Sequence, residues 1–491
     1  MSQGNRKVQY LVTFAVCLAS VSTGVVLTWT TPAIPKLLNN ETNIVITKEQ
    51  ISWVAAMGSP GFVAGSLVSR YISDRFGRRA TILMSALPVT IGTIFTVSSN
   101  SVWFLYFTRF LWGVGTGMVV TISPIYLAEI SEKEIRGLLT LSSRFMFTVG
   151  NFLVMVIGSY VTYDTLNYML LVLPVMFFIA CWFIPETPYF TLKEGKVDTA
   201  KRILMKLRKY KDEKKLEEDL ESMQKDVKKE TLRSGSLKEL FTGRQYRKAV
   251  IICTGLKLTQ MLSGSILILH YLGLIMQDGK IDMKLTTAFT IFGGVRIISG
   301  IVSSLLADRV GRRSLLIMSY LGTGCALALT AAYFYVFEVL KMDQDVITPY
   351  GQVAFIGIIL AVILSTIGFN SLIYVIPAEM FPMNVKSVAM TALNVFGGLS
   401  NFAIIKLFLE LLHLFGLFGV FTMFATISLV GCVFSICLVP ETKGKSLREI
   451  LVALQGTAYD EAAENLNKVT TIGMSINENN ELMELKNTEQ N

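Results

Sequence analysis

The chain alternates long apolar runs with short polar segments from its start to about residue 440. Runs of about 20 apolar residues are long enough to cross the hydrocarbon core of a bilayer as α-helices. Twelve such runs lie at residues 9–30, 51–70, 80–98, 102–124, 140–161, 168–186, 249–276, 286–307, 314–340, 351–376, 388–412 and 416–440. The pattern therefore predicts an all-α membrane protein with twelve transmembrane helices.

One polar interval, residues 187–248, is much longer than the others and separates six predicted spans from six. Its apolar residues Ile203, Leu204 and Leu207 recur at helical spacing, which predicts short amphipathic helices. We therefore expect five segments. They are an N-terminal segment 1–8, a six-helix half 9–186, a linker 187–248, a second six-helix half 249–440 and a polar, largely disordered tail 441–491.

Composition agrees with a membrane protein, because 52% of the 491 residues are apolar and only 16% are charged. The net charge of +9 is concentrated in the linker and in the loops on its side of the predicted membrane. Lys and Arg favour cytoplasmic loops, so we expect a plasma-membrane protein with both termini cytoplasmic. Such scattered charge argues against a nucleic-acid partner. Asn40, in a glycosylation sequon of the first outer loop, is a candidate glycosylation site.

The two halves carry the same charged motifs in the same order. The sequence Asp-Arg-x-Gly-Arg-Arg follows the second and the eighth span, at residues 74–79 and 308–313. A Glu closes the fourth and tenth spans, with a basic residue seven positions later, and Pro-Glu-Thr follows the sixth and twelfth. Duplicated six-helix halves are typical of transporters with a central binding site.

Basic residues at these positions are explained by anchoring at the cytoplasmic face, but the matched acids are not. Acids and bases at equivalent places in both halves indicate ion pairs between helix ends, which would break and re-form as the halves rock. The candidate gating residues are Asp74, Arg78, Arg79, Glu129, Arg136, Glu186, Asp308, Arg312, Arg313, Glu379, Lys386 and Glu441.

Together with residues 185–188, 260–264 and 440–444, these motifs resemble the sugar porter family of the major facilitator superfamily, over residues 9 to about 450. Around the first span the chain resembles the insect facilitated trehalose transporters. The resemblance implies two pseudo-symmetric six-helix halves and facilitated transport of a sugar such as glucose or trehalose. It further implies that Arg78 and Arg79 pair with Glu129, and that Arg312 and Arg313 pair with Glu379. Glu186 and Glu441 would meet Arg136 and Lys386.

The resemblance also implies which positions bind substrate, since the family binds sugar hydroxyls with amides and aromatic residues of spans five, seven, eight and ten. The residues at these positions are Arg144, Gln260, His270, Arg296, Thr366, Asn370 and Tyr374. Arg144 and Arg296 stand where the family has a neutral amide. An Arg in the middle of a span is costly in lipid. Arg296 therefore either binds backbone carbonyls or snorkels, or it lines the cavity with Arg144 and donates hydrogen bonds to substrate.

Proton-coupled members of this family carry an Asp in the first span, where this chain has Ser22-Thr23-Gly24-Val25. This favours uniport. No ATP-binding motif, metal constellation or nucleophile is present, so we expect no cofactor and no enzymatic activity. The expected partners are a small-molecule substrate and the lipid bilayer, and the oligomeric state stays open. Two alternatives remain: a facilitator of an anionic or non-hexose solute, and a non-transporting nutrient sensor.

Overall fold

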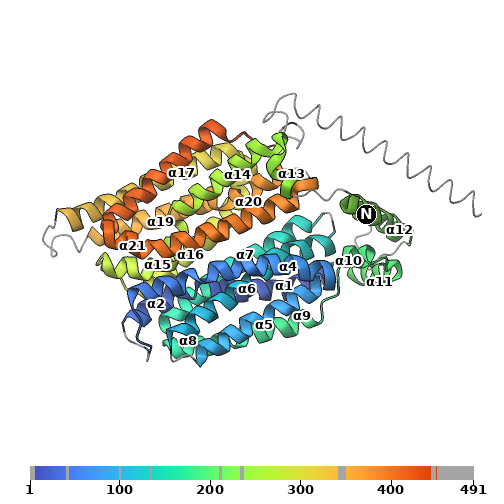
Figure 1. Cartoon of the computed structure of the whole chain (residues 1–491), viewed down its shortest axis with the longest axis horizontal. Coiled ribbons are helices and arrows are strands. Elements are labelled where there is room, and N and C mark those ends of the chain that lie inside the picture. Colours follow the sequence, from blue (N-terminus) through green and yellow to red (C-terminus); the bar gives the residue numbers. More distant parts are fainter. Residues whose placement is uncertain are drawn as a thin grey trace, which may run out of the picture.

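The computed structural model describes residues 6–39, 42, 44–98, 101–132, 134–208, 213–232, 237–340, 350–381, 383–443 and 449. Every regular element among them is a helix (Figure 1). The first half contains α1 (Lys7–Thr28), α2 (Thr30–Leu38), α3 (Lys48–Ala56), α4 (Gly58–Phe76), α5 (Arg78–Val97), α6 (Val102–Ile130), α7 (Arg136–Tyr160), α8 (Tyr163–Leu170) and α9 (Val172–Trp182).

Four helices follow at one end of the bundle, which we call the linker end; the first three lie together and the fourth lies beside the second half (Figure 1). They are α10 (Pro188–Lys193), α11 (Val197–Arg208), α12 (Glu213–Leu232) and α13 (Leu237–Thr242). The second half contains α14 (Arg244–Leu262), α15 (Ser265–Asp278), α16 (Leu285–Val310), α17 (Arg312–Phe334), the π-helix η1 (Tyr335–Val339), α19 (Gly351–Ile367), α20 (Phe369–Met380) and α21 (Met383–Leu438).

The helices reproduce the predicted pattern of spans. Eleven helical stretches within the described residues are long and apolar enough to cross a membrane. The last of them, Val388–Leu438, is 51 residues long and is interrupted at Gly416, whose backbone is not helical (φ 65°, ψ −179°). This stretch therefore contains two spans, and the prediction of twelve helices in two halves is confirmed.

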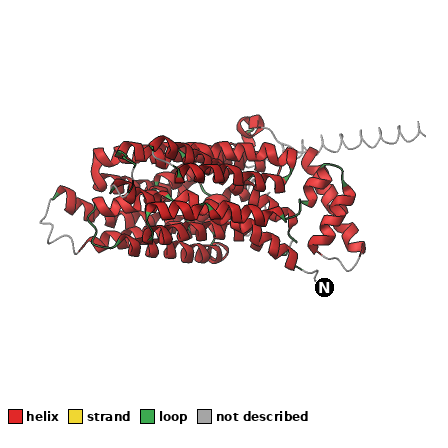
Figure 2. Ribbon diagram, turned by 90° about the horizontal axis from the view of Figure 1, so that it is seen from below, coloured by secondary structure: helices red, strands yellow, loops and turns green. Residues whose placement is uncertain are grey.

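Close helix contact in the first half depends on small residues. α4 packs against α6, and a Cβ added at Gly65 would overlap the backbone of Val114. A Cβ at Gly117 would likewise overlap the backbone of Phe62. Lipid offers little hydrophobic drive for helices to associate, so such close approach provides much of the packing energy. Gly65 of α4 and Gly117 of α6 thus allow the two backbones to approach closely. Figure 2 shows the helices running along the long axis of the bundle.

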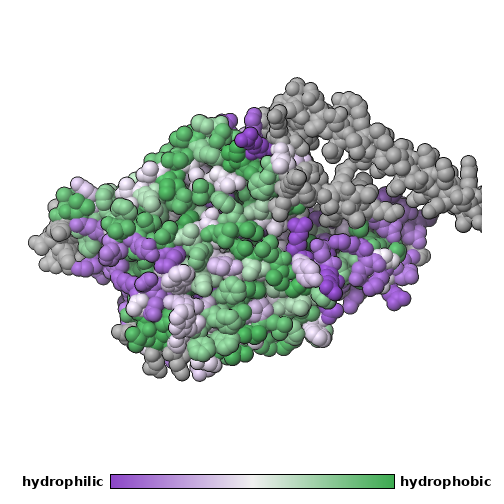
Figure 3. Space-filling view, viewed as in Figure 1, coloured by the Kyte–Doolittle hydropathy of each residue, from purple (hydrophilic) through white to green (hydrophobic). Residues whose placement is uncertain are grey.

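Apolar side chains cover much of the flank of the bundle, and polar ones cover the linker helices (Figure 3). Leu87 is 56% exposed and Ile94 is 51% exposed on α5, and Ile356 is 53% exposed on α19. Large exposed apolar surfaces on a soluble monomer are uncommon. This surface is therefore suited to contact lipid tails.

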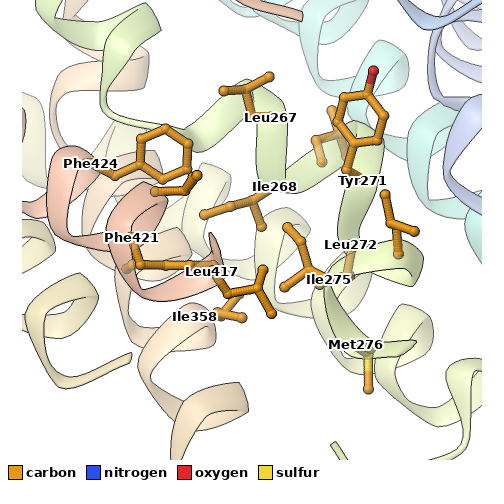
Figure 4. Packing of buried hydrophobic residues seen from close by; sticks show 14 of the residues in the cluster. Leu267, Ile268, Tyr271, Leu272, Ile275, Met276, Ile358, Leu417, Phe421 and Phe424 are labelled. Carbon is orange, nitrogen blue, oxygen red and sulfur yellow. The ribbon is translucent and has the colours of Figure 1, made fainter. Parts of the chain in front are cut away.

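The two halves meet through an apolar cluster toward the end opposite the linker. Ile34, Ile51 and Met155 of the first half share this cluster with residues of α15, α19 and α21. Figure 4 shows the α15 side chains facing Leu417, Phe421 and Phe424 of α21. Thr31 Oγ1 adds a hydrogen bond to the Leu269 carbonyl oxygen at 2.5 Å. The opposite end is therefore closed by contacts between the halves.

Candidate functional site

Polar side chains from both halves meet in the interior of the bundle. Gln260, near the end of α14, donates from Nε2 to Oδ1 of Asn370 in α20 at 2.9 Å. Arg144 of α7 donates from Nη2 to the backbone carbonyl oxygen of Asn370 at 3.2 Å. Both second-half residues lie beside helix breaks, at Gly264 (φ 83°) and Gly368, where backbone groups leave the helical ladder. The cluster thus connects the halves at the broken segments of spans seven and ten.

The Tyr374 ring lies beside two cations. The Arg144 guanidinium carbon is 4.1 Å from its centroid, and Lys257 Nζ of α14 is 5.0 Å from it. Tyr374 is 40% exposed, whereas Lys257 is only 8% exposed. Lys257 was not among the residues predicted from the sequence, because Arg144 and Arg296 were identified by the resemblance, although a lone charge inside the span 249–276 is itself a signal.

A small hollow opens beside this ring. Its lining combines Lys257, Tyr374 and Asn394 with apolar side chains of α14, α20 and α21. The hollow therefore offers a cation, a hydroxyl, an amide and an aromatic face next to one another. This is a suitable set for a polar solute that also has an apolar side.

Three further predicted residues lie outside this cluster. His270 Nδ1 is 2.7 Å from Thr30 Oγ1 across the boundary between the halves, and His270 is buried. Nη1 of Arg296 in α16 is buried and has no hydrogen-bond partner among the described residues. Thr366, at the end of α19, uses its carbonyl oxygen to accept from Ser371 Oγ at 2.8 Å.

A second Arg inside the first half has a different environment, and the sequence prediction omitted it. Arg109 of α6 is 2% exposed and donates to three backbone carbonyls, those of Val26 at 2.8 Å, Val54 at 3.1 Å and Ala55 at 3.5 Å. These carbonyls lie in the last turns of α1 and α3, where no following helical N–H is available. Arg109 therefore stabilises two helix ends, whereas Arg296 has no such carbonyl partner.

Two buried polar atoms, one in the interior cluster and one on α16, have complementary hydrogen-bonding capacity. Oε1 of Gln260 is an acceptor without a partner among the described residues. Nη1 of Arg296 is a donor that also has no partner among them. A sugar hydroxyl both donates and accepts, so it can satisfy either atom. Buried polar atoms without partners are uncommon in folded proteins, and a bound hydroxyl would give each of these two atoms a partner.

The charged motifs form equivalent clusters at the linker end. Arg78 Nη2 pairs with Glu129 Oε1 at 3.1 Å, and Arg312 Nη2 pairs with Glu379 Oε1 at 3.3 Å. Both pairs are those that the resemblance implied. Thr442 Oγ1 adds a hydrogen bond to the second oxygen of Glu379 at 2.6 Å. Each pair connects the helix after a Gly-Arg-Arg motif to the end of span four or ten.

Arg79 and Arg313 do not pair with these acids, which corrects the expectation. Arg79 Nη2 donates to the Trp182 carbonyl oxygen at 2.5 Å, and Arg313 Nη2 donates to the Ile436 carbonyl oxygen at 2.6 Å. Both therefore join the start of one helix to the end of another through a backbone carbonyl. A guanidinium can satisfy the carbonyls that a helix end leaves unpaired.

Glu186 and Glu441 also bind differently from the expectation, since neither meets Arg136 or Lys386. Glu186 accepts the backbone N–H groups of Arg78 and Arg79, at the first turn of α5. Glu441 accepts the corresponding groups at the start of α17. A helix start presents several unpaired N–H donors and a positive dipole end, so a carboxylate is stabilised there without a cationic side chain.

The remaining predicted residues lie apart from these clusters. Asp74 pairs with Lys193 of the linker at 3.0 Å on the surface. Nε of Arg136 is buried without a partner among the described residues. The side chain of Asp308 and the whole of Asn40 lie outside the described residues.

The two equivalent carboxylates differ in their electrostatics. Burial raises the pKa of Glu186, although backbone N–H donors oppose the change. Burial also acts to raise the pKa of Glu441, but four backbone N–H donors outweigh it, and the pKa falls below its ordinary value. Burial lowers the pKa of Lys386, and the nearby Glu379 charge opposes this. The backbone N–H donors therefore favour the charged carboxylate in both halves, but they outweigh the effect of burial only in the second half.

The chain matches the family described as Sugar (and other) transporter over residues 11–454. The facilitated trehalose transporter Tret1 of Bombyx mori is 31% identical over 461 residues, which cover 94% of this chain and 89% of that protein. Tret1 of Apis mellifera ligustica is 29% identical over 448 residues, which cover 90% of this chain and 87% of that protein.

Solved structures show the same arrangement of helices. The major facilitator superfamily proton:xylose symporter XylE, bound to 6-bromo-6-deoxy-D-glucose, superposes with a TM-score of 0.72 at 18% identity. The match covers 92% of this chain and all of that one. A partially occluded inward-open form of XylE from E. coli also superposes with a TM-score of 0.72. At this identity the likeness establishes the fold, which is that of the major facilitator superfamily.

Proposed function

The chain belongs to the sugar (and other) transporter family, and we propose that it carries glucose or trehalose across the plasma membrane by alternating access. It is a multi-pass membrane protein that performs facilitated sugar transport and is not an enzyme. The choice of trehalose rests on the names of the relatives from Bombyx mori and Apis mellifera ligustica. Its location in the plasma membrane is likewise proposed.

One observation supports the proposed site most directly. Arg144, from the first half, donates to the carbonyl of Asn370 in the second half, beside the Gln260 amide. A ligand bound here would contact both halves, so its binding energy would act on their relative position. We propose that Gln260, Asn370, Tyr374, Arg144, Arg296, His270 and Thr366 bind the substrate.

The linker end is proposed to be cytoplasmic, because the Lys and Arg residues concentrate there. With this orientation both termini are cytoplasmic, and the apolar cluster containing Ile34 and Ile51 closes the outer side. The proposed division of the chain is 1–8, 9–186, 187–248, 249–440 and 441–491. Cleavage of the 187–248 segment by a protease added outside intact cells would contradict this orientation.

The clusters at the linker end are proposed to act as gates. The Arg78–Glu129 and Arg312–Glu379 pairs each lie within one half and hold helix ends in a fixed arrangement. Ion pairs near a surface are individually modest, about 0–1 kcal/mol. Several acting together can change the balance between two conformations that differ by a few kcal/mol.

The proposed mode is uniport. Span one presents Ser22, Thr23 and Gly24 to the interior and carries no carboxylate within α1. Uptake into proteoliposomes of a labelled panel containing glucose, trehalose and xylose tests the proposal. Saturable uptake of at least one of these sugars is expected. Specific binding without any flux would instead support the sensor alternative.

A further inference from the structure

Within the proposed transport function, we infer that the site also accepts, and binds more tightly than glucose, an acidic sugar whose carboxylate or phosphate lies between Arg144 and Lys257 beside Tyr374. This names the substrate class of the site described above and rests on the proposed function. It departs from glucose and trehalose, which carry no charge. The inference rests on two cations beside one ring, of which Lys257 is buried and Arg144 is exposed, on a hollow between helices and on the positions of the acids.

The two cations are close to each other. Both lie within 5.0 Å of the Tyr374 centroid, so the guanidinium carbon and Lys257 Nζ are at most about 9 Å apart. Arg144 comes from α7 in the first half and Lys257 from α14 in the second. An anion between them would therefore be held by both halves.

The cations also lie deep along their helices. Arg144 is eight residues from the start of α7, which corresponds to about 12 Å along its axis. Lys257 is thirteen residues from the start of α14, or about 20 Å. Positive charge at such depth requires water, an acid or a bound anion.

The described residues supply no acid at this level. Their Asp and Glu residues within the bundle lie near helix ends, near the Gly416 break or in connecting segments. The acid next along α20 is Glu379, five residues after Tyr374, and it already binds Arg312 and Thr442. Lys406 provides the contrast, because it also lies beside a ring, 4.9 Å from Trp53, but has Glu410 at 3.3 Å.

The donors match an oxyanion. A guanidinium presents a planar fork that suits carboxylate and phosphate, and an ammonium adds a point charge. Only one hydrogen bond, from Nη2 to Asn370, engages the Arg144 guanidinium among the described residues. Its other N–H groups remain available to a ligand.

The surroundings indicate a sugar and not a bare anion. Gln260 Oε1 is a buried acceptor without a partner among the described residues, and Asn394 lines the hollow with Lys257. Hydroxyl groups can satisfy these amides while the charged group binds the cations. A hexuronate and a hexose phosphate share this chemistry.

The test measures binding by the purified full-length protein in detergent, by competition and thermal stabilisation. The probes are glucose, glucuronate, glucose 6-phosphate, inorganic phosphate and chloride. We expect at least one acidic sugar to bind ten times more tightly than glucose, and glucuronate and the phosphate ester distinguish the two anionic groups. Equal affinity for glucose and both acidic sugars, or equal stabilisation by an inorganic anion alone, would overturn the inference.

Variants locate the site. Lys257→Gln and Arg144→Gln should each reduce the ratio of acidic-sugar to glucose affinity by tenfold or more, whereas Lys406→Gln should leave it unchanged. An unchanged ratio in both site variants overturns the assignment of these residues. If neither variant folds, the wild-type ratio still decides whether the substrate is acidic.

Transport by the wild type distinguishes failure of this inference from failure of the proposed function. Glucose flux into proteoliposomes without competition by any acidic sugar overturns this inference and leaves the proposed function intact. Absence of flux for every sugar of both panels overturns both.

Discussion

Glu186 accepts the backbone N–H of Arg79 through both of its carboxylate oxygens, at 3.2 and 3.1 Å. Glu441 has the same place in the second half, where it accepts the N–H of Arg313 at 3.1 Å. A carboxylate that follows one span thus fixes the first turn of another. The internal duplication of the chain therefore extends to the way in which its helices begin.

Gly77 makes this contact possible. Its φ of 96° disfavours any other residue, and a Cβ there would overlap the Glu186 carboxylate. Gly77→Ala should destabilise the protein by about 1–3 kcal/mol through the backbone alone, and by more through the overlap. Gly195→Ala is the matched control, because φ is 76° there but a Cβ would have no neighbour within 4 Å. Thermal unfolding in detergent should therefore show a larger loss for Gly77→Ala, and equal losses would show that the carboxylate contact does not matter.

The unfolding temperatures of Glu186→Gln and Glu441→Gln, each relative to the wild type, should change with pH in opposite directions. The pKa of Glu441 is lowered, so its stabilisation is present above its ordinary value of 4.5 and is lost as pH falls through the lowered pKa. The pKa of Glu186 is raised, so its contribution is greatest below 4.5 and is lost as pH rises through the raised pKa.

As pH rises through the lowered pKa of Glu441 to about pH 5, the unfolding temperature of Glu441→Gln should therefore fall further below that of the wild type. As pH rises from about 4.5 through the raised pKa of Glu186, the unfolding temperature of Glu186→Gln should rise relative to the wild type. Parallel curves for the two variants would contradict the assigned difference in environment.

Glu379→Gln should slow transport far more than it weakens substrate binding. Glu379 lies near the end of α20, where it binds Arg312 and Thr442, and it is remote from the interior cluster. Loss of the ion pair, about 0–1 kcal/mol, together with weakening of the hydrogen bond from Thr442, about 0.5–1.5 kcal/mol, should slow transport by roughly tenfold. Glu410→Gln, at an exposed pair, is the control. Normal flux with lost binding would show that Glu379 contributes to the binding site.

Arg296→Asn should change the order of preference among substrates. The substitution restores the amide of the family and removes a charged donor worth about 1.5–3 kcal/mol, so preference should shift tenfold or more toward neutral hexoses. Arg109→Asn should instead lower stability and leave the order unchanged, because Arg109 binds backbone carbonyls. Competition assays on both variants provide the measurement, and an unchanged order in a well-expressed Arg296→Asn protein would indicate a structural role.

Much of the fold could be predicted from the sequence, because apolar runs of membrane length are a strong and local signal. The pairs Arg78–Glu129 and Arg312–Glu379 could also be predicted, since repeated motifs place them at equivalent helix ends. The partners of Glu186 could not be predicted from the sequence. Charge patterns suggest a cationic side chain, whereas the actual donors are backbone N–H groups whose direction depends on the turn at Gly77.

The interior cations show a similar limit. Arg109 and Arg296 are the same residue type inside predicted spans, and only the packing distinguishes a residue that binds carbonyls from one with a free donor. Lys257 was within reach of sequence reasoning, because charge inside an apolar span requires an explanation. The hydrogen bond from the N–H of Leu417 to Glu338 of η1 could not be predicted from the sequence, since it depends on the break at Gly416.

Counterflow in proteoliposomes tests the central claim, facilitated sugar transport, most directly. Vesicles containing the purified protein are preloaded with unlabelled sugar and diluted into a trace of the labelled form, with equal pH on both sides and a protonophore present. A uniporter should accumulate label transiently above the outside concentration, because exchange needs only the alternating site. Absence of this transient for every sugar that binds, or its dependence on a proton gradient, would contradict the account.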